Sequence, residues 1–227
     1  MIGEGSTPHP GRSALLVVDL QNDYCHPDGA FGAAGRDITG MSQVVTRAHA
    51  LVGTARELGA LVVFAQNTID PEGRLRTALS MRRRRRMSGR DAYVIDGSWG
   101  HELSAPLAPQ PGDVVLRKYA SSAFVGTPLD QALRTADVRL VAVTGVVTWG
   151  CVMATAHSAS TLGYVPYVVS DAVAGDDLRL HDAALDMLRR SFGDDLVGTA
   201  DALVAMWRRS LAGTGVHETA PQPSQED

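Results

Sequence analysis

The chain has 227 residues, of which 44% are hydrophobic and 20% charged, and its formal net charge is −4. This length and composition are typical of a soluble globular protein, and no run of about eighteen apolar residues predicts a transmembrane helix. The mild acidity argues against nucleic acid as a partner, and the two cysteines are too few for a disulfide scaffold, so we expect a cytoplasmic protein with no nucleic-acid or membrane partner.

The two ends of the chain differ from its middle. Residues 1–12 are rich in Gly, Pro, Ser and Thr and lack the apolar segment of a signal peptide, and residues 211–227 are polar. Both compositions predict disordered tails. Residues 13–210 contain no repeat and no convincing linker, and we expect them to form a single domain.

Between the tails, short apolar runs alternate with segments of helical periodicity. The apolar runs predict strands at 14–20, 60–67, 113–118, 139–146 and 164–171, with a further short apolar segment at 195–198. The periodic segments predict helices at 38–58, from Thr127 and Pro128 onward, at 151–162, at 180–192 and at 200–210. This alternation predicts an α/β fold whose doubly wound, mostly parallel six-stranded sheet has helices on both faces.

The long segment between the second and third strands, 68–112, contains five consecutive arginines at residues 82–86. Such a run could attract an acidic partner or an anionic substrate. A solvated helix face or loop, with arginine stems lying on apolar neighbours, is the commoner reason for it and is our preferred interpretation.

Three residues whose side chains could take part in catalysis lie at the carboxyl ends of predicted strands, where doubly wound sheets bind ligands. Asp19 closes the first strand, Lys118 closes the third, and Cys151 follows the fourth at the start of a helix. A helix N-terminus lowers a thiol pKa, an aspartate can accept the thiol proton, and a lysine can keep that aspartate ionised. Lys118 is also the single lysine, the other 20 of the 21 basic residues being arginines, although codon bias explains this equally well. Alone, each residue has a structural explanation; together they suggest a cysteine enzyme.

The segments ALLVVDLQNDY, KYASSAFVGTPLDQAL and VAVTGVVTWGCVMATAHSASTLGYVPYVVSDA resemble the isochorismatase-like cysteine hydrolase superfamily, over residues 13–200. Aspartate, lysine and cysteine occur in the family's order, each inside a matching motif. The segments GSWGHEL, PQPGDVVLRK and FVGTPLD are most similar to the ureidoacrylate and N-carbamoyl amide amidohydrolases.

The resemblance implies Cys151 as nucleophile, Asp19 as proton acceptor and then donor, and Lys118 as the cation between them. It also implies a cis peptide bond between Val146 and Val147, with the backbone N–H groups of Val147 and Cys151 forming an oxyanion hole. Substrate-binding candidates lie beside the motifs: Tyr24, Asn67, Phe124 and Trp149.

Nicotinamidases of this superfamily carry an Asp-x-His metal motif after the second strand, whereas here residues 67–71 read NTIDP. The seven histidines are scattered, so we expect no metal site and no cofactor.

The leading hypothesis is therefore a homo-oligomeric amidohydrolase that cleaves a C–N bond of a small amide, ureido or carbamoyl substrate through a Cys151 thioester. An isochorismatase-type vinyl ether hydrolase, which needs no thiol, and a catalytically silent α/β binding subunit are the alternatives. A nucleotide-binding Rossmann protein is a weaker one, because the glycines Gly3 and Gly5 precede the first strand.

Overall fold

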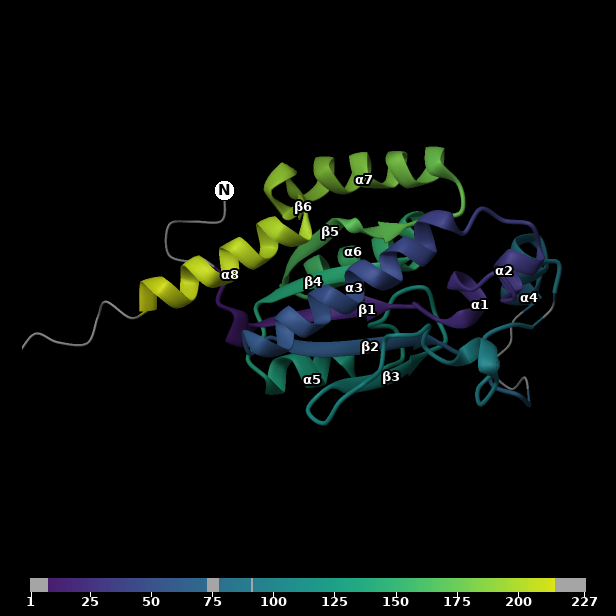
Figure 1. The fold of residues 1–227 in the computed structure, drawn as a ribbon, viewed down its shortest axis with the longest axis horizontal. Helices are drawn as coiled ribbons and strands as arrows, with labels where there is room; N and C mark the ends of the chain where they lie inside the picture. The colour runs from purple at the N-terminus through teal and green to yellow at the C-terminus, as the bar shows by residue number, and fades with distance from the viewer. Residues whose placement is uncertain (1–7, 73–77, 91, 215–227) are drawn as a thin grey trace, which may run out of the picture.

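The computed structural model describes residues 8–72, 78–90 and 92–214 (Figure 1). At its centre is one sheet of six parallel strands in the order β3-β2-β1-β4-β5-β6. The strands are β1 Ser13–Val18, β2 Leu61–Asn67, β3 Val114–Lys118, β4 Leu140–Val146, β5 Val165–Ala174 and β6 Val197–Gly198. The predicted doubly wound α/β fold is confirmed, and the sheet is wholly parallel.

Helices cover both faces of this sheet (Figure 1). The main helices are α3 Thr39–Glu57, α4 Ala78–Ser88, α5 Leu129–Thr135, α6 Met153–Thr161, α7 Leu178–Phe192 and α8 Ala200–Thr214. Alternate residues of β1 point to opposite faces: Leu15 and Val17 join the core beneath α3 and α8, whereas Leu16 and Val18 join the core beneath α5, α6 and α7. A strand buried on both faces is apolar along most of its length, which is why β1 after Ser13 appears in the sequence as a continuous apolar run.

Several boundaries differ from those predicted. Residues 10–12, expected within a tail, form a 3₁₀ turn, and α8 continues beyond residue 210 to Thr214; residues 1–7 and 215–227 lie outside the described part. Short helices α1 Asn22–Cys25 and α2 Ala30–Ala33, and the helix α4, were not predicted. Pro128 occupies the cap position of α5, and the Thr127 hydroxyl accepts the Leu129 N–H at 3.2 Å.

The strand order reverses between β1 and β4. These two strands are neighbours in the sheet, although β2 and β3 lie between them along the chain. Loops leaving these two strands diverge to opposite faces, so a crevice opens beyond their carboxyl ends. None of the helices in the described part of the chain is long and apolar enough to cross a membrane.

Candidate active site

The structure brings together the three residues that the sequence singles out at strand ends. Asp19 follows β1, Lys118 is the last residue of β3, and Cys151 lies in a turn after β4. The Lys118 Nζ atom lies 2.9 Å from Asp19 Oδ2 and donates to Cys151 Sγ at 3.2 Å. All three side chains are buried. One ammonium therefore contacts both a carboxylate and a thiol in a site shielded from water.

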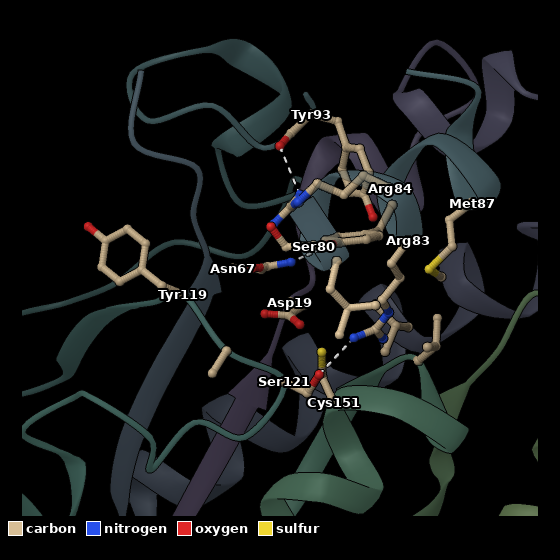
Figure 2. Close-up of a pocket in the computed structure, with 15 residues that line it drawn as sticks. Asp19, Asn67, Ser80, Arg83, Arg84, Met87, Tyr93, Tyr119, Ser121 and Cys151 are labelled. Carbon is tan, nitrogen blue, oxygen red and sulfur yellow. Dashed lines mark hydrogen bonds between the residues drawn. The ribbon is translucent and has the colours of Figure 1, made fainter. Parts of the chain in front are cut away.

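Backbone geometry at the end of β1 orients the Asp19 side chain. Asp19 has a φ of 56°, in the left-handed region that non-glycine residues seldom adopt. Its N–H still donates to the Ala65 carbonyl at 2.9 Å, while its own carbonyl accepts from the Gln21 N–H at 2.8 Å. The strand thus ends abruptly at Asp19, and the carboxylate points into the space between β2 and the Cys151 turn (Figure 2).

Lys118 is fully buried, which is costly for an ammonium unless its charge is compensated. In addition to Asp19 and Cys151, its Nζ donates to the carbonyls of Ala120 at 3.1 Å and Ser121 at 3.3 Å. Burial alone would lower the pKa of Lys118, but the Asp19 carboxylate and the Cys151 sulfur outweigh it and hold this pKa above its usual value. Lys118 is therefore a fixed positive charge.

Asp19 has the properties of a proton acceptor and donor. Burial raises the pKa of its carboxyl group, against the opposing attraction of Lys118. The ion pair with Lys118 is close but poorly aligned, so neither carboxylate oxygen has a well-directed hydrogen-bond donor among the described residues. A carboxyl with a raised pKa and available lone pairs can take a proton and return it.

Cys151 differs from our expectation in one respect. The helix N-terminus was predicted to lower its pKa, and this is wrong: burial, with the negative charge of Asp19, raises the pKa of Cys151 to about 11 despite Lys118. The cost of removing a thiolate from water beside the Asp19 carboxylate outweighs the favourable charge of Lys118. The resting group is a thiol, so a base must remove its proton before it attacks.

The turn that carries Cys151 is a single π-helical turn, η3 Thr148–Val152. It follows a cis peptide bond between Val146 and Val147, at the position that the family resemblance implies. Just before it, Gly145 has a φ of 122°, and a Cβ there would lie 2.0 Å from the Val18 carbonyl oxygen of β1, so only glycine fits. Both Val147 and Cys151, whose amides are the predicted oxyanion hole, line the cavity described next.

A cavity of about 250 Å³ opens over these residues (Figure 2). Its lining combines the strand ends with α4 and two loops: Asp19, Tyr24, Asn67, Leu79, Ser80, Arg83, Arg84, Met87, Tyr93, Tyr119, Ala120, Ser121, Val146, Val147 and Cys151. This volume is below the roughly 300–1,000 Å³ typical of sites for drug-sized ligands, so the ligand is a small molecule.

Two of the four predicted substrate-binding residues line this cavity. Tyr24 and Asn67 do so, and the Asn67 side-chain amide donates to the Tyr24 hydroxyl. Phe124 and Trp149 do not line it. Phe124 stacks on Tyr164 with ring centroids 5.9 Å apart, in the core beneath α5 and α6, and the Trp149 indole N–H donates to Asp176 at 3.3 Å. Both are adjacent to motifs in sequence, but their side chains point elsewhere.

The family model described as the isochorismatase domain matches residues 13–201 of this chain. The chain belongs to the isochorismatase family. Among solved structures, it is similar to a cysteine hydrolase from Pseudomonas syringae pv. phaseolicola 1448A, with a TM-score of 0.78 and 24% identity over 89% of this chain and 95% of that one, a likeness that shows the fold alone.

Two further solved structures have a higher sequence identity to this chain. One is a nicotinamidase from Bacillus subtilis, with 26% identity, a TM-score of 0.65, and coverage of 80% of this chain and 97% of that one. The other is a pyrazinamidase of Pyrococcus horikoshii in complex with zinc, with 28% identity, a TM-score of 0.67, and coverage of 83% and 98%.

The zinc in that pyrazinamidase raises the question whether this isochorismatase-family chain could hold a metal. After β2, Thr68 Oγ1 lies 2.9 Å from His101 Nε2, so this imidazole nitrogen shares a hydrogen bond with a hydroxyl. Within residues 8–72, 78–90 and 92–214, no three His, Cys, Asp or Glu side chains gather into a group that could bind a metal ion. The donor set in the described part does not fit zinc.

The side of the cavity formed by α4 was not predicted from the sequence. Five residues of this helix face the cavity at helical spacing: Leu79, Ser80, Arg83, Arg84 and Met87. The arginine run was interpreted as a solvated face, which fits the exposed Arg82, Arg85 and Arg86. The available signal was periodicity, since positions i, i+1, i+4, i+5 and i+8 share one side of a helix and include two of the arginines.

Proposed function

We propose that this protein hydrolyses a C–N bond of a small amide, ureido or carbamoyl compound through a covalent intermediate on Cys151. The observation that carries this proposal is the position of the Lys118 ammonium, 2.9 Å from Asp19 and 3.2 Å from Cys151, both of which line a small cavity. Two similar structures are named nicotinamidase and pyrazinamidase, names that denote amide hydrolysis, and they support the same reaction class.

In the first half of the reaction, the Asp19 carboxylate accepts the Cys151 thiol proton as the sulfur adds to the substrate carbonyl carbon. The carbonyl oxygen becomes an oxyanion, and the backbone N–H groups of Val147 and Cys151 stabilise it. As this intermediate collapses, the leaving nitrogen takes the proton from Asp19 and the C–N bond breaks. Ammonia or an amine departs, and the acyl group remains on sulfur.

In the second half, Asp19 accepts a proton from a water molecule while the water oxygen adds to the acyl carbon. The C–S bond then breaks, the acid is released, and the sulfur recovers a proton from Asp19. The overall reaction consumes one water and gives an acid and an amine. Lys118 stays protonated throughout, because its charge is held in place by Asp19 and Cys151.

Within this reaction class, the segments GSWGHEL and FVGTPLD favour the ureidoacrylate and N-carbamoyl amide branch. We also propose a homo-oligomeric, cytoplasmic enzyme that uses no metal. Because the described residues offer no suitable group of ligands, dialysis against EDTA is expected to leave the rate unchanged.

The test is ammonia release from a panel of small amides, ureido acids and carbamoyl compounds, with isochorismate included, and mass spectrometry of acid-quenched protein to detect the acyl group on Cys151. Turnover of an amide with an acyl adduct on Cys151 supports the proposal. Hydrolysis of isochorismate alone, equally fast in wild type and Cys151→Ala, would establish the vinyl ether alternative. No turnover of any compound would favour a silent binding subunit.

A further inference from the structure

The helix α4 brings two cations to the cavity that the proposed reaction does not use. Arg83 and Arg84 both line the cavity, whereas Arg82 lies beside Met81 and Arg85 in a separate hollow of the helix. Figure 2 shows the two side chains extending from α4 to different parts of the cavity wall, Arg83 toward Ser121 and Arg84 toward Tyr93.

Each guanidinium is held in place by an uncharged partner. Arg83 Nη1 donates to the Ser121 hydroxyl at 2.9 Å, and a Cβ built on Gly150 would lie 3.5 Å from Arg83 Nη2. Arg83 therefore lies against the turn that carries Cys151. Arg84 lies over the Tyr93 ring, 4.8 Å from its centroid, and donates to the Tyr93 carbonyl at 3.4 Å. Each hydrogen bond uses one of the five N–H groups of a guanidinium, so several remain without a partner in the described part of the chain and could bind a ligand.

The charges of the cavity do not balance. Among the described residues that line it, Asp19 is the single acidic one, and Lys118 already neutralises that charge. Within the described part of the chain, neither Arg83 nor Arg84 forms an ion pair with a carboxylate. Two positive charges in a cavity of about 250 Å³ attract an anion strongly, because low-dielectric walls concentrate the field.

We propose that Arg83 and Arg84 bind a carboxylate of the substrate, so that the compound hydrolysed is a small amide or ureido acid with a free carboxylate. This inference rests on the proposed function for the identity of the reacting group. A planar guanidinium matches a carboxylate through two parallel hydrogen bonds, and a fixed carboxylate orients the scissile carbonyl toward Cys151. The apolar surfaces of Tyr93 and Met87 cover the carbon chain between the two groups.

The test measures binding to Cys151→Ala by calorimetry, because this variant cannot consume the ligand. The ligands are N-carbamoylglycine, N-carbamoyl-β-alanine and N-carbamoyl-γ-aminobutyrate, each paired with its neutral carboxamide. At least one acid is expected to bind about 10- to 100-fold more tightly than its carboxamide, the range for hydrogen bonds to charged groups. Arg83→Gln and Arg84→Gln, each added to Cys151→Ala, should remove this preference. Arg82→Gln, which makes the same charge change on another face of α4, should retain it.

Three outcomes would overturn the inference: acids and carboxamides binding equally, Arg82→Gln losing as much preference as Arg83→Gln, or inorganic phosphate binding more tightly than every acid. Failure of the reaction class is a separate result. If wild type releases no ammonia from these compounds but the Arg-dependent preference is present, the carboxylate site stands and the amidohydrolase proposal falls. If ammonia release is fast and equal for acids and carboxamides, the amidohydrolase proposal stands and the carboxylate site falls.

Discussion

The cavity has two walls of different origin. The strand-end wall consists of Asp19 and Cys151, with the buried Lys118 in contact with both, and the α4 wall consists of the five residues of α4 that face the cavity. Lys118 is 0% exposed, whereas Leu79 of the α4 wall is 75% exposed. The parallel ladder positions the strand ends, with Asn67 opposite Lys118, while side-chain hydrogen bonds of Arg83 and Arg84 hold α4 at the cavity. In the proposed function, the sheet thus carries the chemistry and a separate helix recognises the substrate.

The two walls also tolerate charge for different reasons. In the strand-end wall, a buried ammonium and carboxylate compensate each other, so removing either leaves the other buried and uncompensated. In the α4 wall, Arg83 is exposed and Arg84 is half-buried, so water solvates them when no ligand is bound. Substitutions in the first wall should therefore affect kcat and stability together, and substitutions in the second should affect mainly the affinity for substrate.

The largest effect is expected for Cys151→Ala, which removes the nucleophile. Turnover of the best substrate should fall by at least about 10⁴-fold, because no other group can form the acyl intermediate. The matched control is Cys25→Ala: Cys25 is also buried, with a pKa raised to about 12 chiefly by burial, but it does not line the cavity. It should retain activity. Steady-state rates and circular dichroism of both variants make the comparison, and substantial activity in Cys151→Ala would exclude the thioester route.

Asp19→Asn tests the proton transfer assigned to the strand-end wall. The amide can neither accept the thiol proton nor protonate the leaving nitrogen, and such a loss typically lowers the rate by about 10²–10⁴-fold. It also leaves the Lys118 ammonium without a counter-charge, at a cost of about 3–5 kcal/mol in the free energy of unfolding. Urea unfolding and kinetics on the same samples separate these effects. Asp28→Asn, at a side chain 86% exposed, is the control, and a near-normal rate in Asp19→Asn would reassign the base.

Lys118→Arg keeps the charge but changes its shape. A guanidinium is wider than an ammonium, and in this fully buried position it would bind the Asp19 carboxylate bidentately and hold it away from the thiol. A displacement of about 1 Å costs about 10²-fold in rate, and we expect at least that loss.

The measurements for Lys118→Arg are the hydrolysis rate and the pH profile of Cys151 alkylation by iodoacetamide. In wild type, alkylation should accelerate from pH 7 up to the Cys151 pKa of about 11, since the thiolate is the reactive form. A variant that matches wild type in both measurements would reduce Lys118 to an ordinary strand-end charge.

These two walls also differ in how far the sequence predicts them. The apolar runs and the helical segments between them predict a parallel sheet, and parallel strands bring their carboxyl ends to one edge, so Asp19, Lys118 and Cys151 could be placed together before the structure was known. The α4 wall could not be placed, because it lies in a long connection whose path depends on tertiary packing. Helical periodicity identifies which side of α4 is shared by Arg83 and Arg84, but not what that side faces.

Side-chain direction and environment were also beyond the sequence. Phe124 and Trp149 lie close to the motifs, yet Phe124 stacks on Tyr164 and Trp149 donates to Asp176, and neither ring lines the cavity. Burial and the charge of Asp19 raise the pKa of Cys151 while Lys118 lowers it, and only coordinates show that the thiol is buried beside both. Sequence motifs identify the reacting groups, whereas the energetics of those groups follow from packing.

Ser121 joins the two walls, and its substitution is expected to have the smallest effect. Its backbone carbonyl accepts from Lys118 Nζ at 3.3 Å, and its hydroxyl accepts from Arg83 Nη1 at 2.9 Å. Ser121→Ala removes the second contact and keeps the first. Because a hydrogen bond to a charged group at a partly exposed site contributes modestly, we expect the KM for a carboxylate-bearing substrate to rise by no more than about 10-fold. The kcat should change less than the KM, since the contact with Lys118 persists.

A double-mutant cycle with Arg83→Gln shows whether Ser121 acts through the arginine. If the hydroxyl serves to hold Arg83 in place, Ser121→Ala has nothing left to disturb once Arg83 is replaced, so the KM of the double variant should equal that of Arg83→Gln alone. The carboxamide partner of each substrate is the internal control, because neither substitution should change its KM substantially. Fully additive effects in the cycle would mean that Ser121 contacts the substrate directly. In that case the strand-end wall contributes to recognition as well as to chemistry, and the division between the two walls would be less sharp than their geometry suggests.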